Sequence, residues 1–134
     1  DAYAASKAAV VRLTENLAGD LLAGGIRINC VAPGLVATRM HERTLAAGAA
    51  LAGEDYYERT RRELRSGGAC AEEAARLVCL LLGSEQQVPF TGKLLSARWD
   101  EWRDRDFRER LLASRDLATL RRIDDMAFTA MEET

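Results

Sequence analysis

The first hydrophobic pattern in the chain is helical and covers residues 2–23. Its larger apolar side chains recur three or four positions apart, at Val10, Leu13, Leu17 and Leu21. Residues with that spacing share one face of an α-helix. The Gly24–Gly25 pair follows, and glycine ends helices readily because it adopts the left-handed conformation without steric penalty. The pattern predicts a helix that stops at this pair.

A short β-branched run over residues 26–31 (Ile-Arg-Ile-Asn-Cys-Val) predicts a strand, which the turn signal Pro33–Gly34 ends. A helix, a tight turn and a short apolar strand are typical of half a βαβ unit. We therefore expect an α/β fold with a parallel sheet.

The rest of the chain predicts three further regions. Residues 39–68 favour a helical segment that ends at Gly67–Gly68, and residues 72–82 favour a helix stopped by Gly83. The Thr91–Gly92 turn leads into a last strand over residues 93–97. From Trp99 onward the chain is densely charged, with apolar residues sufficient for one or two amphipathic helices. These are Leu111, Leu112, Leu117, Leu120 and Ile123.

Composition excludes several classes of function. A net charge of −2 gives no basic surface for nucleic acid, and the apolar runs are too short to span a membrane. Cys30, Cys70 and Cys79 lack the paired spacing of a disulfide framework or a zinc site. We expect reduced thiols, no metal, no nucleic-acid or membrane partner, and a cytoplasmic location.

The strongest chemical signal is Tyr3-Ala4-Ala5-Ser6-Lys7, because tyrosine and lysine at i and i+4 lie on one helix face. A free tyrosine has a pKa of about 10 and exchanges protons poorly near neutrality. A nearby ammonium favours the phenolate, so the pair is suited to general acid–base catalysis. By itself the spacing is weak evidence, since it also occurs in ordinary exposed helices.

The surrounding sequence is more specific. Residues 3–40 run Y-A-A-S-K-A-A-V-V-R-L-T-E-N-L-A, then G-G-I-R-I-N-C-V-A-P-G-L-V-A-T-R-M. This stretch resembles the short-chain dehydrogenase/reductase family, whose Tyr-x-x-x-Lys helix is followed by a strand and a Pro-Gly-x-x-x-Thr loop. The resemblance implies that Tyr3 is the catalytic acid/base and that Lys7 assists it and binds the nicotinamide ribose. Ser6 has an equally good interpretation as a small helix-surface residue, and Asn29 is expected to be structural.

The same resemblance assigns a cofactor-binding loop. Pro33 and Gly34 correspond to the turn that lets the backbone approach the nicotinamide. Val36 corresponds to a residue whose backbone binds the carboxamide, and Thr38 to a hydroxyl that contacts the carboxamide or a phosphate. Proline fixes one dihedral angle and glycine removes a side chain, so a rigid loop can present its amides to a flat polar ring. The implied cofactor is NAD or NADP, with the choice left open.

The implied architecture is the C-terminal part of a Rossmann-like, doubly wound parallel sheet over residues 1–98, with a helical charged extension over residues 99–134. Residues 39–68 would cover the substrate, a small molecule with a carbonyl or alcohol group. The resemblance also implies a homodimer or homotetramer. The extension departs from the family pattern, because Ser96-Ala97-Arg98-Trp99-Asp100 stands where many members have an Asp-Gly-Gly turn.

The glycine-rich dinucleotide fingerprint does not occur in the sequence, which starts at Asp1 already within a helical pattern. We therefore expect a fragment whose isolated chain is inactive and binds dinucleotide weakly or not at all. The alternative is a non-catalytic fragment or pseudoenzyme that acts as an oligomerisation or interaction module.

Three further side chains leave two interpretations open. His41, the single histidine, could line a substrate pocket, but an exposed loop position is the favoured prediction. Trp99 and Trp102 are expected to anchor the extension to the body of the protein rather than to bind a ligand.

Overall fold

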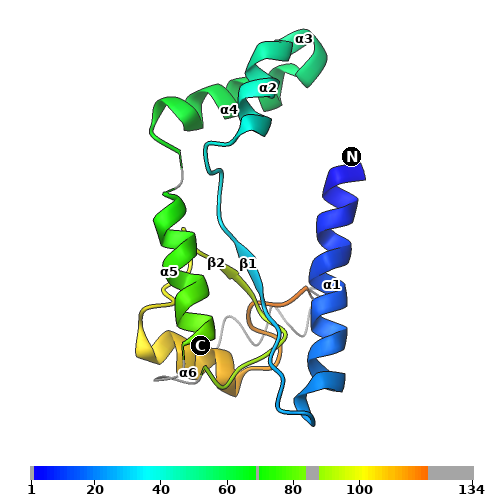
Figure 1. The fold of residues 1–134 in the computed structure, drawn as a ribbon, viewed down its shortest axis with the longest axis vertical. Helices are drawn as coiled ribbons and strands as arrows, with labels where there is room; N and C mark the ends of the chain where they lie inside the picture. Colours follow the sequence, from blue (N-terminus) through cyan, green and yellow to red (C-terminus); the bar gives the residue numbers. More distant parts are fainter. Residues whose placement is uncertain (1, 69, 84–87, 121–134) are drawn as a thin grey trace, which may run out of the picture. The chain divides into compact units, whose positions relative to one another are not determined.

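The computed structural model describes residues 2–68, 70–83 and 88–120 (Figure 1). In chain order the elements are α1 (Ala2–Leu22), β1 (Cys30–Ala32), α2 (Arg39–Ala47), α3 (Ala49–Ala52), α4 (Glu54–Arg65), α5 (Ala71–Leu82), β2 (Leu94–Ser96) and α6 (Arg105–Ala113). They belong to two compact units. Among the described residues, the first unit holds 2–30, 89–94 and 108–120, and the second holds 31–88 and 95–107.

Strands β1 and β2 pair in a two-stranded sheet. Cys30 donates its amide hydrogen to the Lys93 carbonyl (2.7 Å), and Ala32 accepts one from Ala97 (2.9 Å). The partner numbers rise together along both strands, so the pair is parallel, as expected. The last strand predicted over residues 93–97 is confirmed as β2. The doubly wound sheet stays an expectation, because the sheet formed by the described residues has two strands and a doubly wound sheet needs more.

The strand predicted over residues 26–31 is wrong in its first four positions, because β1 begins only at Cys30. The Ile28 backbone is engaged by the turn at residues 91–92. Its amide donates to the Thr91 hydroxyl oxygen (3.0 Å), and its carbonyl accepts from the Gly92 amide (2.7 Å). The Ile28 amide therefore bonds to a side-chain hydroxyl in place of the backbone of a neighbouring strand. The β-branched composition of residues 26–31 does not reveal this competing partner.

Helix α1 confirms the predicted boundaries, and Gly25 ends it. Gly25 has a φ of 73°. Its amide donates to the Leu22 carbonyl (2.9 Å), and the Ile26 amide donates to the Leu21 carbonyl (3.2 Å). This pair of bonds is the Schellman motif, which satisfies the last carbonyls of a helix.

The buried face of α1 matches the predicted apolar face only in part, because Leu17 and Leu21 are half-buried but Val10 and Leu13 are not. Thr14 and Ala18 are buried, whereas Val10 and Leu13 are 52% and 57% exposed. The Thr14 hydroxyl accepts a hydrogen bond from the Cys30 thiol (3.1 Å). Small side chains let the helix approach its neighbours closely, so contact here follows side-chain size rather than hydrophobicity.

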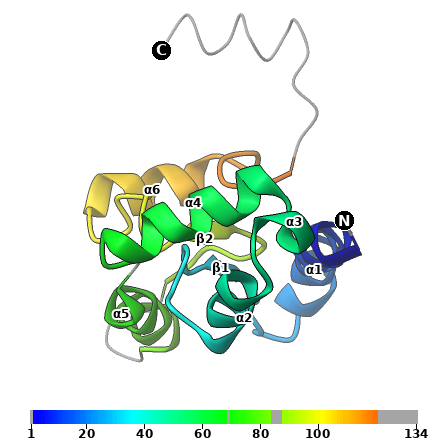
Figure 2. The same cartoon turned by 90° about the horizontal axis from the view of Figure 1, so that it is seen from above.

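The second unit contains the helical segment predicted over residues 39–68. Helices α2, α3 and α4 lie side by side (Figure 2), separated by Gly48 and Gly53, both with positive φ. Helix α4 ends as α1 does. The Gly67 amide donates to Leu64 and the Gly68 amide to Glu63, with Gly67 left-handed at 92°. Helix α5 confirms the prediction for residues 72–82 and buries Leu77 completely.

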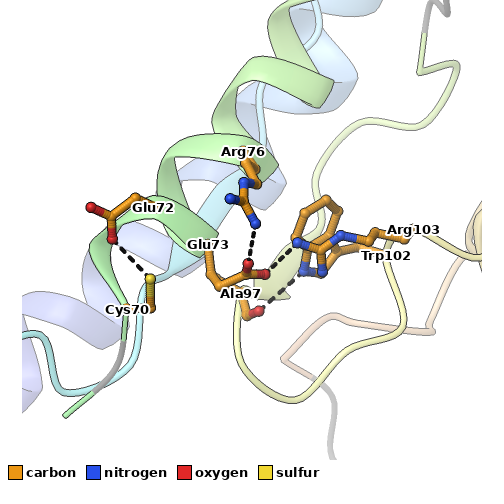
Figure 3. Close-up of polar contacts among 7 residues, drawn as sticks. All are labelled: Cys70, Glu72, Glu73, Arg76, Ala97, Trp102 and Arg103. Atoms are coloured by element: carbon orange, nitrogen blue, oxygen red, sulfur yellow. Dashed lines mark hydrogen bonds and ion pairs between the residues drawn. The ribbon is translucent and has the colours of Figure 1, made fainter. Parts of the chain in front are cut away.

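The start of the extension is held in the second unit by Trp102, which is buried and donates from Nε1 to the Ala97 carbonyl (3.1 Å). Arg103 stacks on the Trp102 ring and pairs with Glu73 of α5, which also accepts from Arg76 (Figure 3). The anchoring prediction is confirmed for Trp102. It is wrong for Trp99, which is 73% exposed beneath the Arg98 guanidinium.

In the first unit the extension is held by Lys93, which is buried. Its ammonium donates to the carbonyls of Ser114 (2.7 Å), Arg115 (3.1 Å) and Leu117 (2.9 Å) just beyond α6. These carbonyls belong to the chain that follows the helix, so the buried ammonium holds this segment by hydrogen bonds to its backbone. Helix α6 confirms one amphipathic helix, and Leu111 is its buried apolar residue. Ile123 lies outside the described residues.

Candidate active site

Tyr3 and Lys7 lie one turn apart at the start of α1, in the first unit. The Lys7 ammonium is 5.3 Å from the centroid of the Tyr3 ring. Tyr3 is 63% exposed, so its phenol is open to a ligand from solution. The i,i+4 spacing has therefore produced the pairing that the sequence predicted, with the cation over the aromatic face.

Ser6 lies between them in sequence but uses its hydroxyl differently. Its Oγ donates to the carbonyl of Tyr3 (2.7 Å), a bond within the first helical turn. That bond favours the structural interpretation of Ser6. Asn29, also in the first unit, is likewise structural: its side chain donates to the Phe90 carbonyl (3.4 Å) and accepts from the Lys93 amide (3.0 Å).

The loop from Pro33 to Thr38 follows β1 in the second unit. Pro33 and Gly34 are exposed, and Gly34 has a φ of 82° that favours glycine. The Val36 amide donates back to the Gly34 carbonyl (3.1 Å), which closes a compact turn. The loop thus offers an exposed backbone bend without a side chain at its centre.

Gly68 also contributes to this loop, and the sequence indicated it only as a helix stop. A Cβ atom at Gly68 would lie 3.1 Å from the Leu35 carbonyl oxygen and 3.7 Å from the Ala37 amide nitrogen. Its φ of 66° is also left-handed. The chain leaving α4 can therefore pass close to the loop backbone only because position 68 has no side chain. The sequence shows the Gly67–Gly68 pair, but it does not show that the loop backbone at Leu35 lies against Gly68.

Thr38 ends the loop as the N-cap residue of α2, with extended backbone angles. Its hydroxyl makes no capping bond to the helix and instead lies 3.0 Å from Nδ1 of His41. His41 is buried at 7% exposure within α2. The prediction of an exposed loop histidine is therefore wrong, because the helix begins two residues earlier and turns the imidazole inward.

The structure brings the candidate residues together in two groups. Tyr3 and Lys7 share one turn of α1 in the first unit, and Pro33 to Thr38 form one loop in the second. Within residues 2–68, 70–83 and 88–120, no three His, Cys, Asp or Glu side chains cluster in a way that could hold a metal ion. None of the described helices is both long and apolar enough to cross a membrane.

Known proteins place these features in a family. A family model described as enoyl-(acyl carrier protein) reductase matches residues 1–97. Dehydrogenase/reductase SDR family member 6 of Danio rerio is 38% identical over 92 residues, which cover 67% of this chain and 36% of that protein. The uncharacterized oxidoreductase YgfF of Escherichia coli (strain K12) is 38% identical over 93 residues, covering 69% of this chain and 35% of YgfF.

A shorter match is closer in identity. Sex determination protein tasselseed-2 of Zea mays is 59% identical over 39 residues, which cover 29% of this chain and 12% of that protein. No solved structure matches.

The chain belongs to the short-chain dehydrogenase/reductase family, a family of oxidoreductases that generally use NAD or NADP. It spans about a third of the length of the curated relatives it matches, 36% for the Danio rerio protein. The matched range 1–97 contains both groups of candidate residues.

Proposed function

We propose that the natural protein carrying this chain is an NAD- or NADP-dependent oxidoreductase acting on a small carbonyl or alcohol substrate. The observation that carries this proposal is the Tyr3–Lys7 pair, exposed at the start of α1 within the range that the family model matches. Tyr3 is 63% exposed, so packing in a core does not explain its position. A role toward a ligand accounts for the Tyr3–Lys7 pair better.

The loop residues fit a nicotinamide cofactor. The exposed Pro33–Gly34 bend leaves room for a flat ring, and the Thr38 hydroxyl is not consumed in capping α2. Lys7, Pro33, Gly34, Val36 and Thr38 would hold the cofactor. When bound, NAD(P) supplies or accepts the hydride that interconverts carbonyl and alcohol.

In reduction, Tyr3 would donate its phenolic proton to the substrate oxygen as negative charge develops there. In oxidation it would accept the proton of the alcohol. Lys7 lies one turn along the same helix face, where its ammonium would favour the phenolate that remains after donation.

The remaining assignments are part of the same proposal. We propose a homodimer or homotetramer, no nucleic-acid or membrane partner, and a cytoplasmic location. The location is supported by Cys30, Cys70 and Cys79, all of which are described and free. Free thiols are the usual state in a reducing compartment.

The alternative is an interaction module without turnover. It is favoured by the apolar surface of α1, where Val10 and Leu13 each expose more than half of their area, at 52% and 57%. Exposed apolar side chains that adjoin on one helix face are typical of a protein–protein contact. A module of this kind would retain its assembly when Tyr3 is changed.

Turnover by the natural protein tests the proposal. A panel of aldehydes, ketones and alcohols is assayed with NADH, NADPH and their oxidised forms, first with the wild type and then with Tyr3→Phe. The substitution should lower kcat by about 10²- to 10⁴-fold, the contribution of a positioned acid or base, with cofactor binding retained.

Ser6→Ala is the matched control on the same turn, since the Ser6 hydroxyl donates to the Tyr3 carbonyl of the helix backbone. It should keep near-normal turnover. Equal losses in the two variants, or unchanged turnover in Tyr3→Phe, contradict the acid/base role. No turnover by the wild type with either cofactor favours the interaction module.

A further inference from the structure

His41 is a buried titratable side chain that the proposed chemistry does not use. It is the third residue of α2 and only 7% exposed. Burying a polar ring costs free energy unless its nitrogens find hydrogen-bond partners. Nδ1 has such a partner in the Thr38 hydroxyl at 3.0 Å, one helical turn away. The two side chains belong to the same unit and the same helix start.

Thr38 behaves unusually for a threonine at a helix N-cap. Such a hydroxyl normally accepts a hydrogen bond from an amide of the first turn. In α2 the Thr38 carbonyl takes the amides of His41 (2.9 Å) and Glu42 (3.2 Å), while the hydroxyl makes no capping bond. The imidazole, rather than the helix, therefore fixes where the hydroxyl points.

We propose that His41 is a positioning residue that holds the Thr38 hydroxyl in the orientation needed to bind the nicotinamide cofactor. This inference rests on the proposed function, which assigns Thr38 to the cofactor. Thr38 is an exposed residue, whereas the buried His41 would act on a ligand only through Thr38.

A threonine hydroxyl has one donor hydrogen and two acceptor lone pairs, and it rotates freely without a partner. If Nδ1 accepts the hydroxyl hydrogen, the lone pairs of Thr38 remain for an N–H donor such as the carboxamide. If Nδ1 carries the hydrogen and donates, the hydroxyl hydrogen remains for an acceptor such as a phosphate oxygen. In both cases the hydrogen bond to Nδ1 holds the side chain of Thr38 in one rotamer before the cofactor arrives, which removes an entropic cost of binding.

The test measures the dissociation constants of NADH and NADPH by nicotinamide fluorescence in the natural protein. His41→Leu keeps much of the side-chain volume but removes the hydrogen bond. It should weaken binding of the preferred cofactor by about five-fold, the factor that one net hydrogen bond is worth. His41→Asn carries a polar atom close to the Nδ1 position and should restore most of the affinity. His41→Gln carries its polar atom near Nε2 and should not.

A double-mutant cycle separates positioning from packing. Thr38→Val removes the hydroxyl, and Thr38→Ser keeps it. In the Thr38→Val background, His41→Leu should have no further effect on the dissociation constant, although it still lowers Tm. An equal effect in both backgrounds means that His41 acts through general stability, and the inference is overturned.

If His41→Leu does not fold, the Asn and Gln variants decide the question alone. Equal affinities in those two variants overturn the inference, and retained affinity in the Asn variant alone supports it. Normal wild-type binding without Thr38–His41 coupling leaves the proposed function standing. No binding of either dinucleotide by the wild type overturns the proposed function together with this inference.

Discussion

Two glycines have the same positive φ angle but different surroundings. Gly25 and Gly92 both have a φ of 73°. A Cβ atom at Gly25 would meet nothing within 4 Å, whereas one at Gly92 would lie 3.0 Å from Cβ of Ala18. A left-handed conformation costs an L-residue about 1–2 kcal/mol at either position. Only at Gly92 does a steric conflict add to that cost.

We predict that Gly92→Ala destabilises the natural protein more than Gly25→Ala. Gly25→Ala should lower the free energy of unfolding by about 1–2 kcal/mol, through backbone strain alone. Gly92→Ala should lose roughly a further 1–3 kcal/mol, as overpacking against a helix does. Urea denaturation monitored by circular dichroism measures both. Equal losses would mean that α1 moves to accommodate the extra methyl group at no cost. That result contradicts the predicted steric conflict with Ala18.

Glu73 shows how tertiary contacts act on a single charge. The hydrogen bond donated by Arg103 holds the pKa of Glu73 below its ordinary value, and the positive charge of Arg76 contributes in the same direction. A carboxyl group whose pKa is lowered by folding stabilises the protein above the unfolded pKa. That contribution disappears as the pH falls through the folded pKa.

Glu73→Gln should therefore lower Tm at pH 7, and the difference from the wild type should vanish as the solution is acidified below the usual range of a glutamate. The effect is small, because the pair is solvent-exposed and screened by salt. Glu58→Gln is the matched control, since the ion pair of Glu58 with Arg61 (2.9 Å) lies within one helix. A Tm difference that is constant from pH 7 to acid contradicts an ionic origin.

At the scale of elements, the start of the extension depends on one of its two tryptophans. Trp102 combines near-complete burial with a hydrogen bond to Ala97 and a stacked Arg103. Trp99, three residues earlier, is 73% exposed. The sequence predicted the same anchoring role for both tryptophans. The difference in their burial arises from the turn between β2 and α6. In this turn the Ser96 amide donates to the Asp100 carboxylate (2.7 Å).

Trp102→Ala should lower the free energy of unfolding by about 3–5 kcal/mol, the usual cost of removing a buried aromatic side chain. Trp99→Ala should change it by no more than about 0.5 kcal/mol, as expected of an exposed position. Chemical denaturation followed by circular dichroism measures both variants. Similar costs at the two positions refute the assignment of Trp102 as the anchor.

At the scale of the whole molecule, the chain carries the Tyr3–Lys7 pair that we propose for proton transfer, but its 134 residues contain no glycine-rich dinucleotide fingerprint. It aligns to about a third of its relatives, 36% of the Danio rerio protein. That fingerprint supplies the tight turn and helix N-terminus on which a pyrophosphate is held.

We therefore predict that the isolated 134-residue chain binds NADPH and NADH weakly or not at all. Isothermal titration of the purified chain with both dinucleotides measures this, and circular dichroism confirms its helical content beforehand. Tight, saturable binding by the isolated chain overturns the prediction. In that case Lys7 and the loop from Pro33 to Thr38 suffice to hold the cofactor.

The sequence by itself determined the features that depend on local spacing. The i,i+4 pair Tyr3–Lys7 and the helical segments follow from periodicity. The helix ends at Gly25 and Gly67 follow from the conformational freedom of glycine. These features need only neighbours within about one helical turn, and the chain fixes those neighbours directly.

The tertiary structure alone decided which side chains meet across long separations. It buried Thr14 and Ala18 of α1 in place of Val10 and Leu13, and it engaged Ile28 with the turn at residues 91–92. It also turned His41 inward onto Thr38. Burial depends on which distant segment packs against an element, and hydrogen-bond partners depend on which groups arrive there. Neither is a property of the local sequence.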